Sequence, residues 1–297
     1  MSATGRAHDI GPIWGAFGSQ KKKSGPEPTD RPTRGEPMDD ASFHQILDHF
    51  NLSWKGYRKV RKGVKKRLSH HMQKLGCVSV REYIAAVSRA PEIEQECRMH
   101  LTVSISRFFR DRRLWDSLEI TELPYLISAC GSVFRVWSCG CARGEEAYSF
   151  KILWDRLRCA VPNLPLLALW ATDINPAYIE MAKQGVYGIS SLKELPRGDI
   201  DRYFDQVTGK KRYVVKPFLK EGIRFDQHDI TKHPPPNTQF EVVFLRNNLL
   251  TYYRAPEKEK ALETILRALA PGGMLITGSH EKLPEGFGLM KASAEHP

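Results

Sequence analysis

The sequence of 297 residues lacks the features of a membrane-spanning or secreted protein. It has no apolar run of the roughly 18 residues that a membrane-spanning helix needs, and its first residues lack the apolar core of a signal peptide. The only close pair among its six cysteines, Cys139 and Cys141, has no second ligand pair at zinc spacing. We therefore expect a cytoplasmic protein with reduced thiols, no metal site and no membrane insertion.

Acidic residues are the minority, because 34 Asp and Glu stand against 45 Lys and Arg for a net charge of +11. This excess favours acidic partners such as nucleic acid, anionic lipid or a carboxylate-rich protein. One predicted helical stretch, 54–75, carries a basic stripe opposite its apolar face: Lys55, Arg58, Lys59, Lys62, Lys65, Lys66 and Arg67. The stripe is either a docking face for an acidic helical protein or a solvated helix face. We expect no nucleic acid, because Trp54 and Tyr57, the aromatic residues here, belong to the apolar face.

The chain is predicted to have three regions. Residues 1–38 mix Gly, Pro and charge with little to bury, which is typical of a disordered basic leader. Residues 39–120 form a helical N-terminal domain, with amphipathic helices over 80–88, 93–101 and 108–118. In 121–297 strands and helices alternate, which predicts an α/β fold with a parallel, Rossmann-like sheet. A hairpin around the Thr208-Gly209 turn indicates a small inserted β subdomain at about 195–222.

The stretch RVWSCGCARGEEAYSF places a glycine-bearing turn between a buried strand and a helix. Glycines there let a backbone approach a nucleotide, but Gly140 and Gly144 lack the third glycine of a dinucleotide site and the Lys-Ser/Thr of a phosphate loop. Glu145 and Glu146 follow directly. They disfavour a pyrophosphate and favour a cationic sulfonium that carries a ribose, which is the chemistry of S-adenosylmethionine. The alternative is that both glutamates only complement the helix dipole.

Asp173 ends the second predicted strand, in WATDIN. An acidic side chain at this position can accept hydrogen bonds from ribose hydroxyls in a nucleotide-binding sheet. Alternatively, Asp173 caps the helix that begins near Asn175.

Several motifs together resemble the CheR family of chemotaxis receptor methyltransferases. They are SISRFFRD, RVWSCGCARGEEAYS, ATDINPAYIEMAKQGVYG, RYF, FEVVFLRNNLLTYY and LAPGGMLITGSHE, in this order over 43–283. The resemblance implies a helical N-terminal domain, an S-adenosylmethionine-dependent methyltransferase domain and a small inserted β subdomain.

The resemblance also implies roles for individual residues. The implied cofactor contacts are Ser104, Ser106, Arg110, Gly140, Glu146, Asp173, Asp229, Ile230 and Asn247, and the implied catalytic residues are Arg110 and Tyr252. Ser104 and Ser106 replace the family's usual Asn and Thr, and Asp229 replaces a usual Asn. An ungapped match puts Thr251, not Tyr252, at the family's tyrosine. From the residues alone, Arg110 can instead pair with Asp111 or Asp116, and Tyr252 can be a core aromatic.

The reaction that the resemblance implies is methyl transfer to glutamate side chains of chemotaxis-type receptors, which forms glutamyl methyl esters. The implied partner is the cytoplasmic signalling region of a chemoreceptor or a similar acidic helical protein, docked at 54–75. Two other readings remain open. One is a methyltransferase of the same fold that acts on another substrate, and the other is an inactive S-adenosylmethionine-binding scaffold in a signalling complex.

Overall fold

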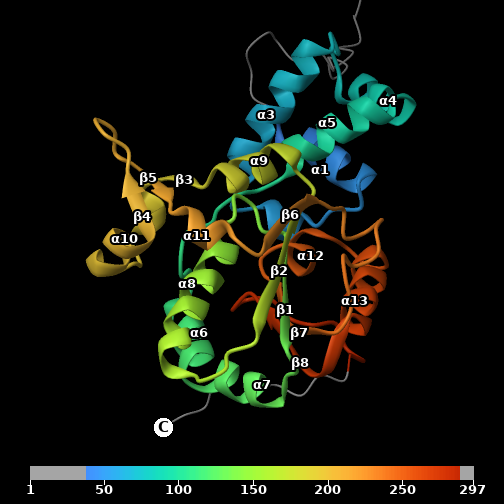
Figure 1. Cartoon of the computed structure of the whole chain (residues 1–297). Helices are drawn as coiled ribbons and strands as arrows, with labels where there is room; N and C mark the ends of the chain where they lie inside the picture. Colours follow the sequence, from blue (N-terminus) through green and yellow to red (C-terminus); the bar gives the residue numbers. More distant parts are fainter. Residues whose placement is uncertain (1–37, 288–297) are drawn as a thin grey trace, which may run out of the picture. The chain divides into compact units, whose positions relative to one another are not determined.

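The computed structural model describes residues 38–287, apart from the side chain of Cys159, and shows a helical region followed by an α/β region (Figure 1). Of the expected leader 1–38, only Met38 belongs to this described part. Within residues 38–287, no helix combines the length and the apolar character needed to cross a bilayer.

The helical region begins with α1 to α5, which pack around their own apolar cluster. The helices are α1 (Asp40–His49), α2 (Trp54–Tyr57), α3 (Arg61–Lys74), α4 (Val80–Arg89) and α5 (Pro91–Leu101). Asp39 caps α1 by accepting a hydrogen bond from the Ser42 N–H, and Ser79 caps α4 in the same way through Glu82 N–H. Phe43, Leu68 and Tyr83 are fully buried in this cluster. The single helix expected over 54–75 is wrong, because a turn at 58–60 separates α2 from α3.

The helix expected over 108–118 begins later than the sequence predicts. The backbone N–H groups of Phe108 and Phe109 donate to the Ser191 carbonyl and to Ser149 Oγ. Phe109 also has a left-handed backbone, with φ 50°. The prediction is wrong here because burial of both rings against distant segments outweighs helical periodicity. The helices that follow are α6 (Arg112–Ser117), the π-helix η1 (Leu118–Glu122) and α7 (Leu123–Ala129).

The central sheet has five parallel strands in the order β6-β2-β1-β7-β8. They are β1 (Val133–Cys139), β2 (Leu166–Asp173), β6 (Ile223–Gln227), β7 (Phe240–Leu245) and β8 (Leu269–Thr277). The α/β, Rossmann-like fold class is therefore confirmed. The short edge strand β6 is not among the strands that the sequence predicts.

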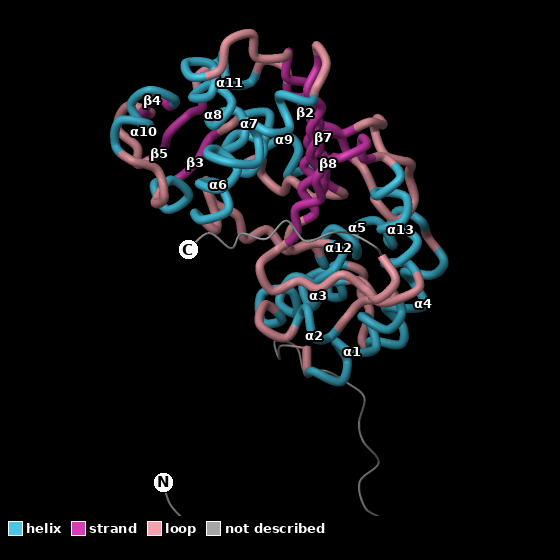
Figure 2. Tube along the Cα trace, turned by 90° about the horizontal axis from the view of Figure 1, so that it is seen from below, coloured by secondary structure: helices cyan, strands magenta, loops and turns pink. Residues whose placement is uncertain are grey.

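Helices cover both faces of this sheet (Figures 1 and 2). Along β1, Phe134 and Val136 join the apolar cluster that contains α8 (Glu145–Ala160). Trp137 and Cys139 point to the opposite face, into the cluster that contains α13 (Glu257–Arg267). Because successive side chains of a strand alternate between faces, a strand buried on both sides becomes a continuous apolar run.

A second, three-stranded antiparallel sheet has the order β3-β5-β4. Its strands are β3 (Val186–Gly188), β4 (Phe204–Gln206) and β5 (Arg212–Val215), and the 3-10 helix η2 (Ile189–Leu192) and α10 (Arg197–Tyr203) pack beside it. The helix α9 (Pro176–Gln184) packs on β2 and β6 of the central sheet, and α11 (Pro217–Lys220) packs on α8. The expected hairpin is β4 paired with β5. The range proposed for the subdomain, 195–222, contains this hairpin, while β3 precedes it in the chain.

The strand order reverses between β1 and β7, because the chain runs outward from β1 through β2 to β6 and then returns to the other side of β1. In open parallel sheets, ligands bind outside the carboxyl ends of the strands at such a switch point. The residues that follow β1, β2, β6 and β7 are therefore the ones expected to form a site.

Candidate active site

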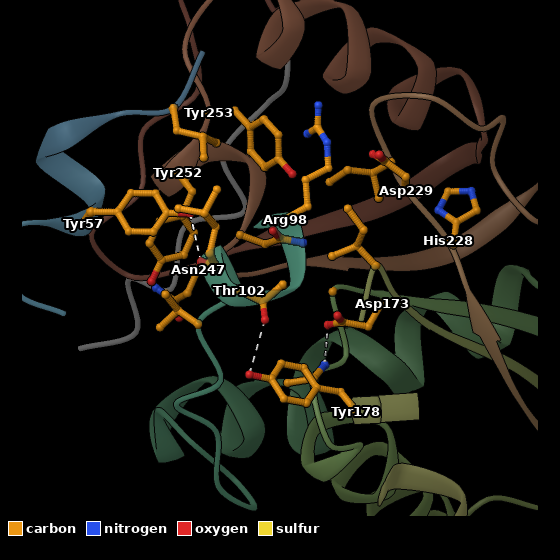
Figure 3. Close-up of a pocket in the computed structure, with 18 residues that line it drawn as sticks. Tyr57, Arg98, Thr102, Asp173, Tyr178, His228, Asp229, Asn247, Tyr252 and Tyr253 are labelled. Atoms are coloured by element: carbon orange, nitrogen blue, oxygen red, sulfur yellow. Dashed lines mark hydrogen bonds between the residues drawn. The ribbon is translucent and has the colours of Figure 1, made fainter. Parts of the chain in front are cut away.

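Two adjoining cavities lie at this edge of the sheet. The larger cavity has about 800 Å³ of space, its open mouth included, and the smaller has about 490 Å³. The larger cavity is lined from β2, the loops after β6 and β7, and the helical region (Figure 3). The residues that line both cavities are Val103, Gly140, Ala142 and Asn247. The site residues predicted from the sequence line one cavity or both, except Ser104 and Glu145.

The turn after β1 forms the floor between the cavities. Gly140 has φ 86°, and a Cβ at this position would lie 2.1 Å from Asn248 Nδ2. Glycine is therefore required both by the backbone conformation and by the close approach of the loop after β7. The turn is also tied to β2, since the N–H groups of Gly140 and Cys141 both donate to the Thr172 carbonyl.

Asp173, at the end of β2, faces the larger cavity. Its Oδ2 accepts a hydrogen bond from Ala142 N–H, and its Oδ1 accepts one from Asn175 N–H, both at 2.9 Å. The helix cap of α9 is Asn175 itself, whose side chain accepts from Ala177 N–H. A carboxylate has about four acceptor positions, so Asp173 keeps capacity for further donors. Capping is therefore not its role, and the carboxylate is available to a ligand in the cavity.

Asp229 and Ile230 line the larger cavity from the loop after β6. Asp229 is buried, and its Oδ1 accepts hydrogen bonds from the N–H and the hydroxyl of Thr231. Ile230 belongs to the apolar cluster on the α13 side of the sheet. In this part of the cavity, Ile230 therefore provides an apolar surface and the Asp229 carboxylate provides a hydrogen-bond acceptor.

The two glutamates at the start of α8 have different positions. Glu146 lines the smaller cavity, where it accepts from Ser138 Oγ at 2.8 Å and pairs with Arg246 at 3.1 Å. Glu145 is fully buried and lines neither cavity. Burial raises the pKa of Glu145, and Arg143 acts against that rise. The prediction that both glutamates present negative charge to the ligand is therefore wrong for Glu145, which reaches neither cavity. The charge of Glu146 does face the smaller cavity, but Arg246 partly neutralises it.

Arg110 lines the smaller cavity from the segment before α6. Its guanidinium donates to the Ile105 carbonyl at 2.9 Å. The two aspartates considered as its partners are paired elsewhere, Asp111 with Arg246 and Asp116 with Arg112. Within residues 38–287, no carboxylate lies within 4.0 Å of the Arg110 guanidinium, so its charge is available to an anionic ligand.

Asn247 and Tyr252 come from the loop after β7 and from α12 (Leu249–Tyr252). Asn247 has a left-handed backbone with φ 54° and lines both cavities. Tyr252 lines the larger cavity and packs on Tyr57, with 4.8 Å between ring centroids. Burial raises the pKa of Tyr252 to about 12, while Arg110 acts against this and Glu281 adds to it. Its hydroxyl therefore stays protonated at neutral pH and can donate a hydrogen bond.

Thr251 does not line either cavity, because its hydroxyl donates to Glu281. Of the two residues considered for the tyrosine position, only Tyr252 reaches the cleft. Ser106 lines the smaller cavity, whereas the hydroxyl of Ser104 is buried without a hydrogen-bond partner in the described part of the chain.

The helical region supplies a wall of the larger cavity that sequence reasoning missed. Arg98 on α5 and Thr102 just after it both line the cavity. Thr102 Oγ1 accepts a hydrogen bond from Asn175 Nδ2 at 3.0 Å, donates one to the Met99 carbonyl at 2.6 Å, and lies 3.4 Å from Tyr178 Oη, beside Asp173 (Figure 3). No local pattern reveals these residues, since they meet the sheet edge only in the folded chain.

The side chains present match the parts of S-adenosylmethionine. Asp173 can accept from the ribose hydroxyls, Ile230 offers an apolar contact to adenine, and the Arg110 guanidinium can take one carboxylate through a forked pair of hydrogen bonds. A parallel sheet with a cleft at its switch point is the architecture of nucleotide-binding α/β proteins, and the residues of this cleft suit S-adenosylmethionine-dependent methyltransferases among them.

Comparison with known proteins gives the family. The model of the CheR methyltransferase SAM-binding domain matches residues 104–295, and the chain belongs to the CheR methyltransferase family. Its cofactor is S-adenosylmethionine, and it is a methyltransferase that depends on this cofactor. Ser106, Arg110, Asp173 and Asn247 all lie within the matched range.

Individual relatives are similar at moderate identity. A chemotaxis protein methyltransferase of Listeria monocytogenes is 29% identical over 228 residues, which cover 76% of this chain and 84% of that protein. Chemotaxis protein methyltransferase 1 of Pseudomonas aeruginosa is 29% identical over 240 residues, 77% of this chain and 86% of that protein. An uncharacterised 104.1 kDa protein of Rhodobacter capsulatus is 29% identical over 222 residues, which span 74% of this chain but 23% of that protein.

We predict that cofactor affinity depends on pH through Asp173. Burial raises its pKa to about 6, while the backbone N–H groups of Asn175 and Ala142 act in the opposite direction. Ribose hydroxyls donate best to the ionised carboxylate, so affinity should be constant above about pH 6 and fall by up to about tenfold per unit below it. Calorimetric titration with S-adenosylhomocysteine between pH 5 and 8 measures this. Asp173→Asn should remove the dependence, and an affinity of the unaltered protein that stays constant down to pH 5 contradicts the prediction.

Proposed function

We propose that this protein transfers the methyl group of S-adenosylmethionine to glutamate side chains of chemotaxis-type receptors, forming glutamyl methyl esters. The observation that carries the proposal is the Arg110 guanidinium, which lines the smaller cavity and has no carboxylate within 4.0 Å in the described part of the chain. An arginine in this situation attracts a carboxylate and aligns it through two parallel hydrogen bonds. The names of the Listeria and Pseudomonas relatives agree with a chemotaxis role.

The reaction makes small demands on acid and base groups. A glutamate with an ordinary pKa near 4.3 is ionised at neutral pH, so its oxygen can attack a methyl group without a dedicated base. When bound, S-adenosylmethionine supplies an electrophilic methyl group on a positively charged sulfur. The protein's task is orientation, which can contribute roughly 7 to 11 kcal/mol to lowering a barrier.

In this proposal the two cavities bind different parts of the reactants. Asp173 and Ile230 hold the adenosine part in the larger cavity, with Asp229 as a further acceptor. Ser106, Gly140, Glu146 and Asn247 line the path from there to Arg110. Tyr252, protonated at neutral pH, donates a hydrogen bond to an oxygen of the reacting carboxylate. Ser104 lies off this path and is not assigned a contact.

The proposed partner is the cytoplasmic signalling region of a chemoreceptor or a similar acidic helical protein, which also implies a cytoplasmic location. Opposite charge would speed the encounter with the basic stripe. Its side chains at Lys55, Arg58, Lys59, Lys62 and Lys66 belong to exposed residues. Two members are already engaged within the protein: Lys65 pairs with Asp40 at 2.7 Å, and Arg67 donates to the carbonyls of His100 and Thr102. We therefore restrict the proposed docking face to the five residues of the stripe that are exposed and not engaged in this way.

The expected product is a methyl ester, and its alkali lability tests the proposal. The protein, incubated with S-adenosylmethionine tritiated in the methyl group and a membrane fraction rich in chemoreceptors, should label a receptor protein. Mild alkali should release the label as volatile methanol, because esters hydrolyse under conditions in which methylated amines and nucleic-acid bases do not.

A receptor fragment whose candidate glutamates are changed to glutamine is the matched control, and it should remain unlabelled. Label that resists alkali, or that enters nucleic acid, would assign the cleft to another substrate. Absence of any transfer while cofactor binding is retained would favour the inactive scaffold.

A further inference from the structure

Glu281, in the loop after β8, is the one carboxylate in residues 38–287 that joins the loop after β7 to α12. Its Oε2 accepts hydrogen bonds from Asn247 N–H at 2.8 Å and from Gly278 N–H at 2.7 Å. Its Oε1 accepts the hydroxyl of Thr251. Hydrogen bonds to a charged acceptor are about twice as strong as neutral ones. These three contacts therefore add to the ion pairs that Arg246, in the same loop, forms with Asp111 and Glu146.

The segment that Glu281 holds does not maintain its conformation by local interactions. Asn247 has the left-handed φ of 54°, a sparsely populated conformation for a residue with a side chain. The helix that follows, α12, has four residues, and helices this short do not persist without tertiary contacts. The carboxylate contacts both the strained residue and the short helix, which is also held by the buried Leu249 and by the Ser53 N–H, a donor to the Tyr252 carbonyl.

This segment carries two residues of the cleft. Asn247 lines both cavities, and Tyr252 at the end of α12 lines the larger one. The Asn247 side chain lies directly on Gly278, where an added Cβ would be 2.7 Å from Asn247 Nδ2 and 2.7 Å from Glu281 Oε2. The contacts at Gly278 thus fix the Asn247 side chain at the point where the two cavities meet.

We propose that Glu281 is a positioning residue of the cofactor site: its carboxylate holds the loop after β7 so that Asn247 and Tyr252 face the cleft. Glu281 itself lines neither cavity, so it acts through these two residues. The proposal rests on the cleft being the cofactor site and not on the identity of the methyl acceptor. Binding of S-adenosylhomocysteine tests it without any acceptor, which keeps its outcome separate from the labelling experiment.

The test compares Glu281→Ala with Glu281→Gln by calorimetric titration with S-adenosylhomocysteine. Alanine removes all three hydrogen bonds, and we expect affinity to fall at least about tenfold, the equivalent of one charge-assisted hydrogen bond. Glutamine can preserve the network, since its oxygen can accept from both N–H groups and its amide can donate to the Thr251 oxygen. Affinity should then stay within about threefold of the unaltered protein. Such a rescue distinguishes positioning through hydrogen bonds from a need for the charge itself.

The exposed Glu285, four residues further along the same loop, provides the matched control, and Glu285→Ala should leave affinity unchanged. A folded Glu281→Ala variant with unaltered affinity overturns the proposal, as does a Glu281→Gln variant that binds as weakly as the alanine variant. If Glu281→Ala does not fold, Gly278→Ala decides. Its Cβ would push Asn247 away from Glu281, so affinity should fall at least about tenfold, and an unchanged affinity overturns the proposal.

Discussion

Asp173→Ala is expected to abolish measurable binding of S-adenosylmethionine, with a rise in Kd of at least about 100-fold. The carboxylate faces the larger cavity and has acceptor positions beyond the two used by Ala142 and Asn175. Two ribose hydroxyls that donate to a charged acceptor contribute about 1.5 kcal/mol or more each, and every 1.4 kcal/mol is a factor of ten in affinity. Calorimetric titration of the purified variant measures the loss.

Two comparisons make this result specific. Asp226 lies on β6 directly beside Thr172 of β2, and its side chain belongs to an exposed residue. Asp226→Ala should therefore bind the cofactor as the unaltered protein does. The Asp173→Ala variant should retain a cooperative thermal unfolding transition, which shows that the fold persists. A folded variant of unchanged affinity would refute the ribose role of Asp173.

Arg110→Ala is expected to slow methyl transfer by about 100-fold or more. Its guanidinium is the proposed partner of the acceptor carboxylate, and a misplacement of a reacting group by about 1 Å can cost a factor of 100 in rate. Arg110→Lys keeps the charge but not the forked geometry and should recover only part of the rate. The measurement is the single-turnover rate on a receptor fragment at saturating cofactor.

The same variant shows which carboxylate Arg110 holds. S-adenosylhomocysteine carries an amino-acid carboxylate, and 5′-methylthioadenosine has the same adenosine part without it. Weaker binding of the first alone would assign Arg110 to the cofactor carboxylate, and unchanged binding of both would assign it to the acceptor. Arg113 on α6 is exposed and lines neither cavity, so Arg113→Ala is the control. A normal rate in Arg110→Ala, with normal binding of both ligands, contradicts any role in the site.

The fold was predictable where local patterns are strong. The strands β1, β2 and β7 are apolar because both faces of the sheet are covered, and helices such as α4 carry a cap residue and an apolar stripe. The segment at Phe108 and Phe109 was predicted wrongly, since their N–H groups bond to distant residues in place of a helix. The strand β6 was missed because an edge strand of five residues has little apolar pattern to distinguish it.

The residues of the candidate site, too, were only partly predictable from the sequence. Gly140 and Asp173 were identifiable because one directly follows a strand and the other ends one, and the carboxyl ends of parallel strands converge. Asn247 was predicted only from the family resemblance. Glu145 and Glu146 are adjacent in the chain, yet one is buried and the other lines a cavity. Neighbouring residues of a helix point about 100° apart, so their exposure depends on what packs against each direction.

The amino-acid pattern alone predicted the alternation of strands and helices and the edge of the sheet at which the two cavities lie. These follow from interactions among residues a few positions apart. Only folding brought Thr102 to Asn175, 73 positions away, and Glu281 to Thr251, 30 positions away. The direction in which a side chain points, its burial and its hydrogen-bond partners are set by segments far apart in the chain, because desolvation and hydrogen bonding act through space.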